Sequence, residues 1–373
     1  MRRERVEVMK VLVLSGRFGM GHEMAANAIC EEFKKIDENT KIVKKDLLEE
    51  LYPHLSKLIF GGFRMMVEHC HGIYNFIYKM SGKMKVEVRP RGEAIYKKLR
   101  ALLETEEPDV IVCTHPMCVK AIASYKGRTG LKTPLVTCIT DISMHPEWTA
   151  LQTDIYLAPT QEIKEHLIQS GTRSENILVT GIPVRQQFLR CRYQEDSLRK
   201  KENTKNVLIM GGGLGLMPDL KELLGKLHHM HGVRTVVITG KNKKVYDEWV
   251  DRYDDVKVLG YTENISKYMR WADLVITKAG GITLFELIHS EVPLFVIHPF
   301  LEQEMNNAGY AAEKGFAKVV WGKREAYIPE LQKLLEDEDE LKRMKANVKR
   351  AKTDMIDVDL DKAVEIMEER MTA

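Results

Sequence analysis

The sequence predicts an α/β protein made of two Rossmann-like domains that face a central cleft. Short, almost continuous apolar runs alternate with helical patterns, which is typical of parallel sheets whose strands are buried on both faces. An apolar run followed by a glycine-rich loop and a helical pattern occurs twice, starting at residues 8–14 and again at 207–210. Residues 186–206 are polar, charged and without strand periodicity, so we interpret them as a linker between the domains.

The length and composition agree with this architecture. A chain of 373 residues exceeds one ordinary hydrophobic core, and 44% hydrophobic with 30% charged residues excludes a largely disordered protein. A net charge of +3 argues against a dedicated nucleic-acid binder. No apolar run approaches the ~18–20 residues needed to cross a bilayer, and the basic N-terminus lacks the apolar segment of a secretory signal. The six cysteines have no zinc-site spacing, which predicts free thiols in the cytoplasm.

The N-terminal domain is predicted to span residues 1–185. Its first strand, at 8–14, leads through the glycine loop 15–21 into a helix that begins near His22. A long helical region that reaches about Leu103 follows the second strand. The other predicted strands are one that ends at Asp46 and those at 109–113, 135–139 and 155–157.

The C-terminal domain, predicted at residues 207–354, repeats this order. A first strand at 207–210 leads into the glycine loop 211–215 and a helix. An acidic run at 336–340 begins a solvated helix near the end of this domain. The remaining strands are predicted at 235–239, 256–259, 274–277 and 294–297.

The two glycine loops differ from the best-known nucleotide motifs. Gly16 and Gly21 have the spacing of a P-loop. His22 and Glu23 replace its Lys and its Ser or Thr, however, so an NTPase is excluded. The second loop begins like a dinucleotide fingerprint, but no acidic residue ends the next strand to hold a ribose. The first loop is followed by Asp46, but its glycine spacing is GxxGxG, so a nicotinamide dehydrogenase stays an alternative. Both loops place N–H groups at a helix N-terminus, where a phosphate or a developing anion is stabilised.

Five segments carry a resemblance to a known family. They are the loop 15–22, Thr140-Asp141 with His145, Trp148 and 154–156, the stretch 179–184, the motif 277–286 and the motif 303–308. In this order they are similar to the bacterial processive diacylglycerol glucosyltransferases and the plant monogalactosyldiacylglycerol synthases. A more distant resemblance is to the peptidoglycan transferase that adds N-acetylglucosamine to a lipid-linked precursor. The sequence departs from the family at Leu301-Glu302, where Pro-Gly is usual, and at Gly16-Arg17, near which the plant enzymes have Asp.

The resemblance implies a GT-B fold and an inverting, metal-independent transfer of a hexose from a UDP-sugar to diacylglycerol, for glycolipid synthesis. It implies no cofactor besides the UDP-sugar donor substrate, and a terminal helix at about 355–373 that packs back on the N-terminal domain. The DxD-like run at 357–361 is interpreted as helix surface, so no metal site is expected. Two alternatives stay open: a same-fold transferase acting on a polyprenyl-linked or small-molecule acceptor, and a non-catalytic UDP-sugar-binding protein.

His22 is the expected catalytic base. The helix dipole at its position disfavours imidazolium, so the ring is neutral and able to accept a proton. The resemblance implies that it deprotonates the acceptor hydroxyl during attack on the anomeric carbon. A plain polar residue at a helix start is the alternative. The expected acceptor-binding residues are Gly21, Asp141, His145 and Trp148, of which Trp148 fits a core position equally well.

Glu286 is expected to accept hydrogen bonds from both ribose hydroxyls of UDP, a role that the resemblance implies. Thr283 and Glu286 also have the spacing of a capping box, which is the alternative. Gln303 and Glu304 are expected to bind the sugar hydroxyls, and the glycines to admit the diphosphate. The full set of expected donor-binding residues is Gly211, Gly213, Gly215, Gly240, Tyr261, Lys278, Gly280, Gly281, Thr283, Glu286, Gln303, Glu304 and Asn307.

Residues 58–91 mix large apolar and aromatic side chains with a basic cluster. The cluster consists of Lys79, Lys83, Lys85, Arg89 and Arg91. Such a surface suits an anionic leaflet, so we expect a cytoplasmic protein that is peripheral on the inner face of the cell membrane. Its expected partners are a UDP-sugar, a lipid acceptor and an anionic membrane surface, but no nucleic acid. A core helix pair with a basic end is the alternative.

Overall fold

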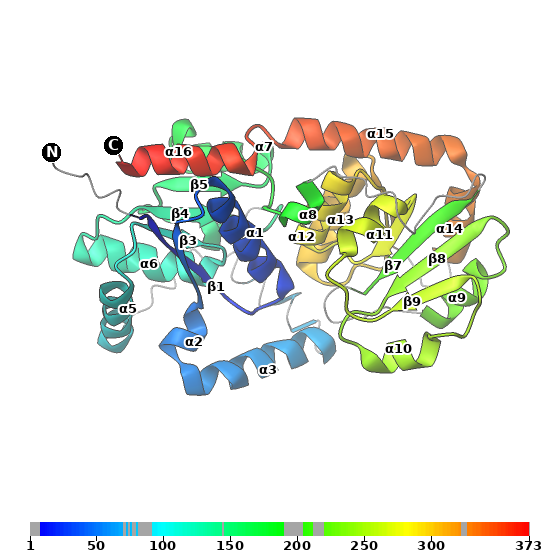
Figure 1. Ribbon diagram of the computed structural model, residues 1–373, viewed down its shortest axis with the longest axis horizontal. Coiled ribbons are helices and arrows are strands. Elements are labelled where there is room, and N and C mark those ends of the chain that lie inside the picture. Colours follow the sequence, from blue (N-terminus) through cyan, green and yellow to red (C-terminus); the bar gives the residue numbers. More distant parts are fainter. Residues whose placement is uncertain are drawn as a thin grey trace. The chain divides into compact units, whose positions relative to one another are not determined.

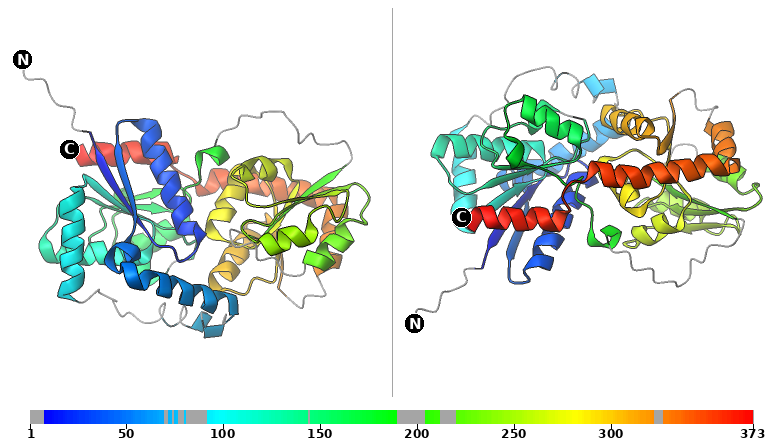
Figure 2. Two further views of the ribbon diagram at one scale, coloured as in Figure 1. Left: turned by 60° about the horizontal axis from the view of Figure 1, so that its bottom comes forward. Right: turned by 90° about the horizontal axis from the view of Figure 1, so that it is seen from above.

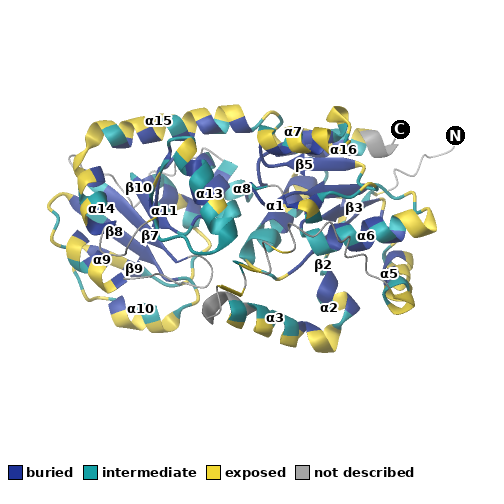
Figure 3. Cartoon of the chain, turned by 180° about the vertical axis from the view of Figure 1, so that it is seen from behind, coloured by how far each residue is buried: buried dark blue, intermediate teal, exposed yellow. Residues whose placement is uncertain are grey.

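The computed structural model describes residues 8–69, 72–73, 75–76, 80, 92–143, 145–189, 204–211, 220–321 and 327–372. The chain divides into two compact units (Figure 1). The first unit comprises residues 1–186 together with 355–373, and the second unit comprises residues 187–354. In both units the inner strands are buried and the helices are exposed mainly on their outer faces (Figure 3). This confirms the predicted α/β architecture.

The first unit has one sheet of six parallel strands in the order β2-β1-β3-β4-β5-β6. The strands are β1 Lys10–Ser15, β2 Lys41–Asp46, β3 Val110–Cys113, β4 Leu135–Cys138, β5 Ile155–Ala158 and β6 Ile177–Val179. The inner strands are continuous apolar runs because helices cover both faces, whereas the edge strand β2 carries three lysines. The chain leaves β1 toward β2 and returns on its other side to β3, so the topological switch point lies between β1 and β3.

Alternate residues of β1 serve two separate cores. Leu12 and Leu14 pack with the helices on one face of the sheet, and Val11 and Val13 with those on the other. The helices on the first face are α2 Leu47–Leu51, α5 Glu93–Glu106, α6 Pro116–Thr129 and α7 Gln161–Gln169. The opposite face is covered by α1 Met20–Ile36 and α16 Leu360–Thr372. This unit also contains α3 Pro53–His69 and the 3-10 turns η1 Pro146–Trp148 and η2 Ser174–Asn176.

The helix α16 completes the first unit from the far end of the sequence. It lies alongside α1, as Figure 1 and Figure 2 show. Ala363, Val364 and Met367 are fully buried there, in one core with Ile29 and Phe33 of α1.

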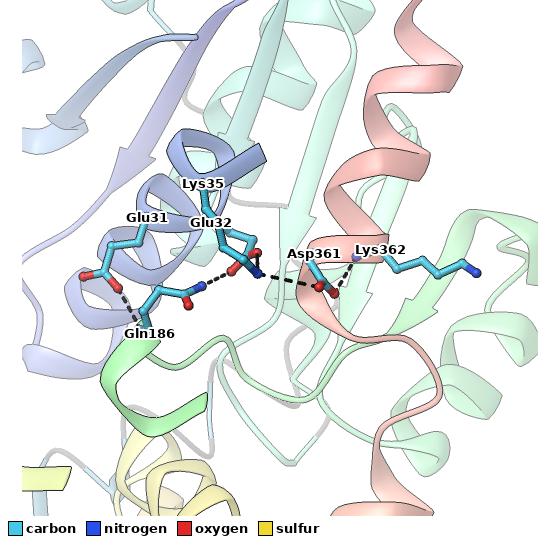
Figure 4. Close-up of polar contacts among 6 residues, drawn as sticks. All are labelled: Glu31, Glu32, Lys35, Gln186, Asp361 and Lys362. Carbon is cyan, nitrogen blue, oxygen red and sulfur yellow. Dashed lines mark hydrogen bonds and ion pairs between the residues drawn. The ribbon is translucent and has the colours of Figure 1, made fainter. Parts of the chain in front are cut away.

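A polar network ties this helix pair to the point where the chain leaves the first unit (Figure 4). Glu32 of α1 is buried, and it accepts hydrogen bonds from Lys35 Nζ at 2.8 Å and from the Gln186 side-chain amide. The Gln186 backbone N–H donates to Glu31 at 2.8 Å. Lys35 also forms an ion pair of 3.6 Å with Asp361 of α16. One face of α1 therefore anchors both the outgoing chain and the returning helix.

The second unit repeats the design with strand order β12-β11-β10-β7-β8-β9, all parallel. Its strands are β7 Lys205–Met210, β8 Val233–Ile238, β9 Val256–Leu259, β10 Leu274–Thr277, β11 Leu294–Ile297 and β12 Ala317–Val320. Its helices are α8 Gln186–Leu189, which begins at the unit boundary, α9 Leu220–Leu227, α10 Lys243–Trp249, α11 Ile265–Trp271, α12 Gly281–Ser290, α13 Glu302–Glu313, α14 Tyr327–Glu336 and α15 Glu338–Met355. The switch point of this sheet lies between β7 and β10.

Three details differ from the sequence-based expectations. The predicted long helical region is interrupted, since α2 ends at Leu51 and Tyr52 leaves the helical conformation before Pro53. The predicted linker is partly regular structure, because 186–189 form α8 and 205–206 belong to β7, while 190–203 lie outside the described residues. The short strands β6 and β12 were not predicted. Among the helices that the structure describes, none is both long enough and apolar enough to cross a membrane.

Candidate active site

His22 lies at the switch point of the first unit. The loop after β1 turns into α1 at Gly19, whose φ of +127° disfavours any side chain, and His22 is the third residue of that helix. Across the switch point, His115 follows β3 and caps the start of α6, where its Nδ1 accepts the Met117 N–H at 3.1 Å. Parallel strands end at the same edge of a sheet, so both rings lie where ligands bind in open α/β sheets.

Two hydrogen-bonding partners fix the imidazole of His22. Its Nδ1 lies 3.0 Å from the carbonyl oxygen of Thr114, after β3, and 2.7 Å from Oγ1 of Thr140, after β4. A carbonyl oxygen can only accept, so we infer that Nδ1 carries the proton and donates it to Thr114. The lone pair then resides on Nε2. This leaves Nε2 as the ring atom able to take a proton from a substrate.

Burial keeps this ring neutral. It lowers the pKa of His22 below the ordinary value of 6.5, and the opposing effects of Asp141 and of the Thr114 carbonyl are smaller. Burial also raises the pKa of Asp141, against the effects of His22, Trp148 and His145. The sequence-based expectation of a neutral base relied on the helix dipole, whereas in the structure desolvation is the larger cause.

The expected acceptor residues surround His22 in different ways. Gly21 directly precedes it in α1. Trp148 has no exposed surface, its ring centroid lies 6.3 Å from that of His22, and its Nε1 donates to Asp141 at 2.8 Å. Trp148 is thus a core residue that also holds Asp141 in place. The buried His145 caps η1 by accepting the Glu147 N–H at 3.4 Å.

Sequence reasoning missed Thr114 and His115. It gave no role to Phe18 and Thr140, although both lie in segments that carry the family resemblance. Thr114, His115 and Thr140 directly follow or closely follow a strand of the sheet, at the edge where the switch point lies. That position was the available signal, but it becomes informative only once the strand order is known.

In the second unit, the expected donor residues follow the carboxyl ends of five neighbouring strands. Gly211 follows β7, Gly240 follows β8 with a φ of +59°, and Tyr261 follows β9. The segment 278–283 follows β10, and Gln303 and Glu304 follow β11. They therefore gather at one edge of the sheet, around the β7–β10 switch point. Gly213 and Gly215 lie outside the described residues.

The helix α12 begins in the glycine motif after β10. Gly280 is its N-cap and no side chain caps it, so the first N–H groups of a ten-residue helix point to the sheet edge. Because the helix starts at Gly281, Thr283 lies inside it and the capping-box alternative is wrong. Glu286 is buried in the same helix.

The loop between β10 and α12 is supported from beneath by Asn307 of α13. This side chain has no exposed surface, and its amide donates to the carbonyl of Ala279 at 2.8 Å. It therefore shapes the loop, and its place among the donor-binding residues stays a prediction. Lys278 Nζ lies 4.7 Å from the Phe300 ring centroid. Burial raises the pKa of Glu304, and the charge of Lys278 opposes this.

Tyr261 is exposed, and its ring centroid lies 5.7 Å from Lys241 Nζ. A ring and a cation at this edge are chemically suited to a base and a phosphate. Within the described residues, no group of three or more His, Cys, Asp or Glu is arranged to hold a metal ion.

Comparisons with known proteins match both halves of the chain. The sequence model of the Monogalactosyldiacylglycerol (MGDG) synthase family matches residues 22–184, and that of the Glycosyltransferase family 28 C-terminal domain matches residues 206–360. The processive diacylglycerol beta-glucosyltransferase of Bacillus subtilis (strain 168) is 32% identical over 353 residues, which cover 91% of this chain and 90% of that protein. The corresponding protein of Bacillus pumilus (strain SAFR-032) is 32% identical over 352 residues, with the same coverage of both chains.

Solved structures are similar at lower identity. Spinosyn rhamnosyltransferase SpnG has a TM-score of 0.65 at 14% identity, covering 96% of this chain and all (100%) of that one. MurG of Acinetobacter baumannii has a TM-score of 0.60 at 14% identity, covering 97% of this chain and 99% of that one. Two tandem parallel α/β units of this kind define the GT-B class of glycosyltransferase fold. This chain belongs to the glycosyltransferase family of the MGDG synthases and the processive diacylglycerol beta-glucosyltransferases.

Proposed function

We propose that this protein transfers a hexose from a UDP-sugar to diacylglycerol, with inversion and without a metal ion. The observation that carries the proposal is identity of 30–32% to processive diacylglycerol beta-glucosyltransferases over 91% of the chain. The site supports it, because Nε2 of a neutral histidine is available at one switch point and an uncapped helix N-terminus at the other.

In the proposed mechanism, Nε2 of His22 accepts the proton of the acceptor hydroxyl as its oxygen attacks the anomeric carbon from the face opposite UDP. The bond between that carbon and the UDP oxygen breaks, and UDP leaves with the electron pair. The N–H groups at the start of α12 and the ammonium of Lys278 stabilise the charge that develops on the diphosphate. These groups of the chain take the part that a divalent cation would otherwise play.

The decisive experiment incubates the protein with diacylglycerol vesicles and, separately, with UDP-glucose, UDP-galactose and UDP-N-acetylglucosamine. The lipid product is identified by its mass. We expect a hexosyl-diacylglycerol from one donor. Transfer only to a polyprenyl-linked or water-soluble acceptor would support a different transferase of the same fold. UDP binding without transfer or donor hydrolysis would indicate a binding protein.

Glu286→Ala is expected to weaken UDP binding by about 1.5–3 kcal/mol, the range for hydrogen bonds to a charged group. The physical reason is the loss of a carboxylate that accepts from the ribose hydroxyls. Titration calorimetry with UDP measures the change, and Glu286→Gln, which keeps the shape but not the charge, gives an intermediate loss. Unchanged UDP affinity with only a lower melting temperature would instead make Glu286 a structural residue of α12.

We also propose that the protein is peripheral on the inner face of the cell membrane. The helix α3 supports this, because it leaves Leu55, Leu58 and Met65 exposed. A row of exposed apolar side chains on a helix suits the interface between water and lipid. The five residues of the basic cluster predicted to reinforce this surface lie outside the described residues.

Replacing Leu58 and Met65 together by Gln is expected to weaken binding to anionic vesicles by about 1–3 kcal/mol, because two apolar side chains no longer enter the lipid. Replacing the five residues of the basic cluster by Gln should cost roughly 1 kcal/mol per charge at low salt, and less at high salt. Vesicle co-sedimentation measures both. Leu151→Gln, at an exposed leucine outside α3, is the matched control. Equal binding of all variants to anionic and neutral vesicles would contradict the proposal.

A further inference from the structure

Four ring contacts connect α3 to the imidazole of His22. The rings of Phe60 and Phe63, on α3, each meet Phe18 edge-on at a centroid distance of 5.2 Å. Phe18 stacks on His115 at 5.1 Å with an interplanar angle of 29°. His115 in turn meets the ring of His22 at 4.6 Å and 76°, an edge-to-face contact.

The backbone of the loop after β1 is shaped to admit this stack. A Cβ atom at Gly16 would lie 3.2 Å from Cγ of His115 and 3.3 Å from Cδ2 of Phe18, closer than side chains normally approach. A side chain at this position would push at least one of the two rings away by a few tenths of an ångström. The absence of a side chain at Gly16 therefore serves the packing of Phe18 on His115.

His115 is a neutral ring in this position. Its Nδ1 accepts the Met117 N–H, so the proton resides on Nε2. Burial, with a smaller effect of the neighbouring His22, holds the pKa of His115 well below 6.5. It therefore acts on His22 through contact and by excluding water, and not through charge.

The hydrogen bonds at Nδ1 hold one atom of the His22 ring. They do not by themselves fix the orientation of the ring, which can still rotate about Nδ1. The edge-to-face contact with His115 restrains the ring on another side. We propose that His115 and Phe18 are positioning residues, which hold His22 in the orientation that directs Nε2 to the acceptor hydroxyl, with α3 as their support. This inference rests on the proposed function, in which His22 is the base.

The variant His115→Asn tests the inference, because Asn is among the best helix N-caps and so keeps the start of α6 while removing the ring. We expect kcat for glycolipid formation to fall by about 10-fold, part of the general-base contribution, with KM for the UDP-sugar unchanged. Water should then reach His22, so the acidic limb of the pH–rate profile should move to higher pH. The charged or titratable groups that face His22 in the structure are Asp141 and His115, with His145 acting on Asp141.

An NMR titration of the His22 imidazole provides a readout that needs no activity. Its midpoint should rise in His115→Asn and in Phe18→Leu, which loosens the stack without touching the cap. The control is Tyr125→Leu, which removes another buried ring from α6. It should lower stability without moving the acidic limb of the pH–rate profile or the midpoint of the His22 titration.

The possible outcomes separate the two proposals. If kcat falls in His115→Asn while the acidic limb of the pH–rate profile and the midpoint of the His22 titration keep their wild-type values, His115 is only the N-cap of α6 and the inference is wrong. If His115→Asn does not fold, the same criteria apply to Phe18→Leu. If the wild-type protein forms no glycolipid, the proposed function fails, and the shifts of the His22 midpoint then decide the positioning contact by themselves.

Discussion

His22→Ala lowers turnover by about 10²–10⁴-fold, the usual contribution of a positioned general base, because a lipid hydroxyl is a poor nucleophile near neutral pH. The affinity for UDP stays nearly unchanged, since the expected donor residues belong to the second unit and His22 to the first. Steady-state kinetics with diacylglycerol vesicles and calorimetry with UDP measure the two quantities. His166→Ala, at an exposed histidine of the same unit, is the matched control and keeps wild-type turnover.

The pH dependence gives this prediction a second readout. Burial lowers the pKa of His22 below 6.5, so the neutral, active form prevails above that pKa and is lost as the pH falls through it. The wild-type profile therefore has an acidic limb below pH 6.5, and the variant lacks it. A variant that retains wild-type turnover with the same limb would show that His22 is not the base. Asp141 or His145, which lie in the same cluster, would then be the next candidate.

Met367→Ala is expected to destabilise the first unit by about 2–5 kcal/mol, the range for large-to-small changes at a fully buried position. Met367 lies on α16 and has no exposed surface in the core shared with α1. Glu365→Ala, on the exposed side of the same helix, should change stability by less than about 0.5 kcal/mol.

The measurement can be confined to the first unit, because Trp148 is its only tryptophan. In a background with the other three tryptophans replaced by Phe, fluorescence during urea unfolding follows this unit alone. The two units need not unfold together, so a single transition of the whole protein would not give the free energy of unfolding of the first unit. An unchanged midpoint in Met367→Ala would mean that α16 contributes nothing to this core.

Most of the strands that the sequence predicted well lie inside the two sheets. The inner strands β3, β4, β5, β10 and β11 were located to within one residue because burial on both faces makes most of them continuous apolar runs. The edge strand β9 was also located, since three of its four residues are apolar. The two missed strands, β6 and β12, are both at the edge of a sheet. β6 has only three residues, and β12 is half exposed with a lysine in its middle, so neither contrasts with its neighbours in the sequence.

The candidate site was predictable only where its signal is local. His22 and the motif at 277–286 stand out because glycines and a helix start occur within a few residues. Thr114 and Thr140 contact His22 from 92 and 118 residues away, through a strand order that no local pattern encodes. The local sequence also does not reveal that Asn307, a polar residue of a predicted binding motif, is fully buried and donates its amide to the carbonyl of Ala279.

The packing of α16 on α1 also has a consequence for synthesis on the ribosome. The apolar face formed by β1 and α1 emerges early, but the segment that covers it is translated only after the whole second unit. Until then Ile29 and Phe33 have no partner from α16, and nascent chains expose a surface that chaperones bind and that promotes aggregation. Translation that stops before residue 360 yields a chain without α16, so the core that α16 shares with α1 stays exposed. Such fragments are expected to be degraded.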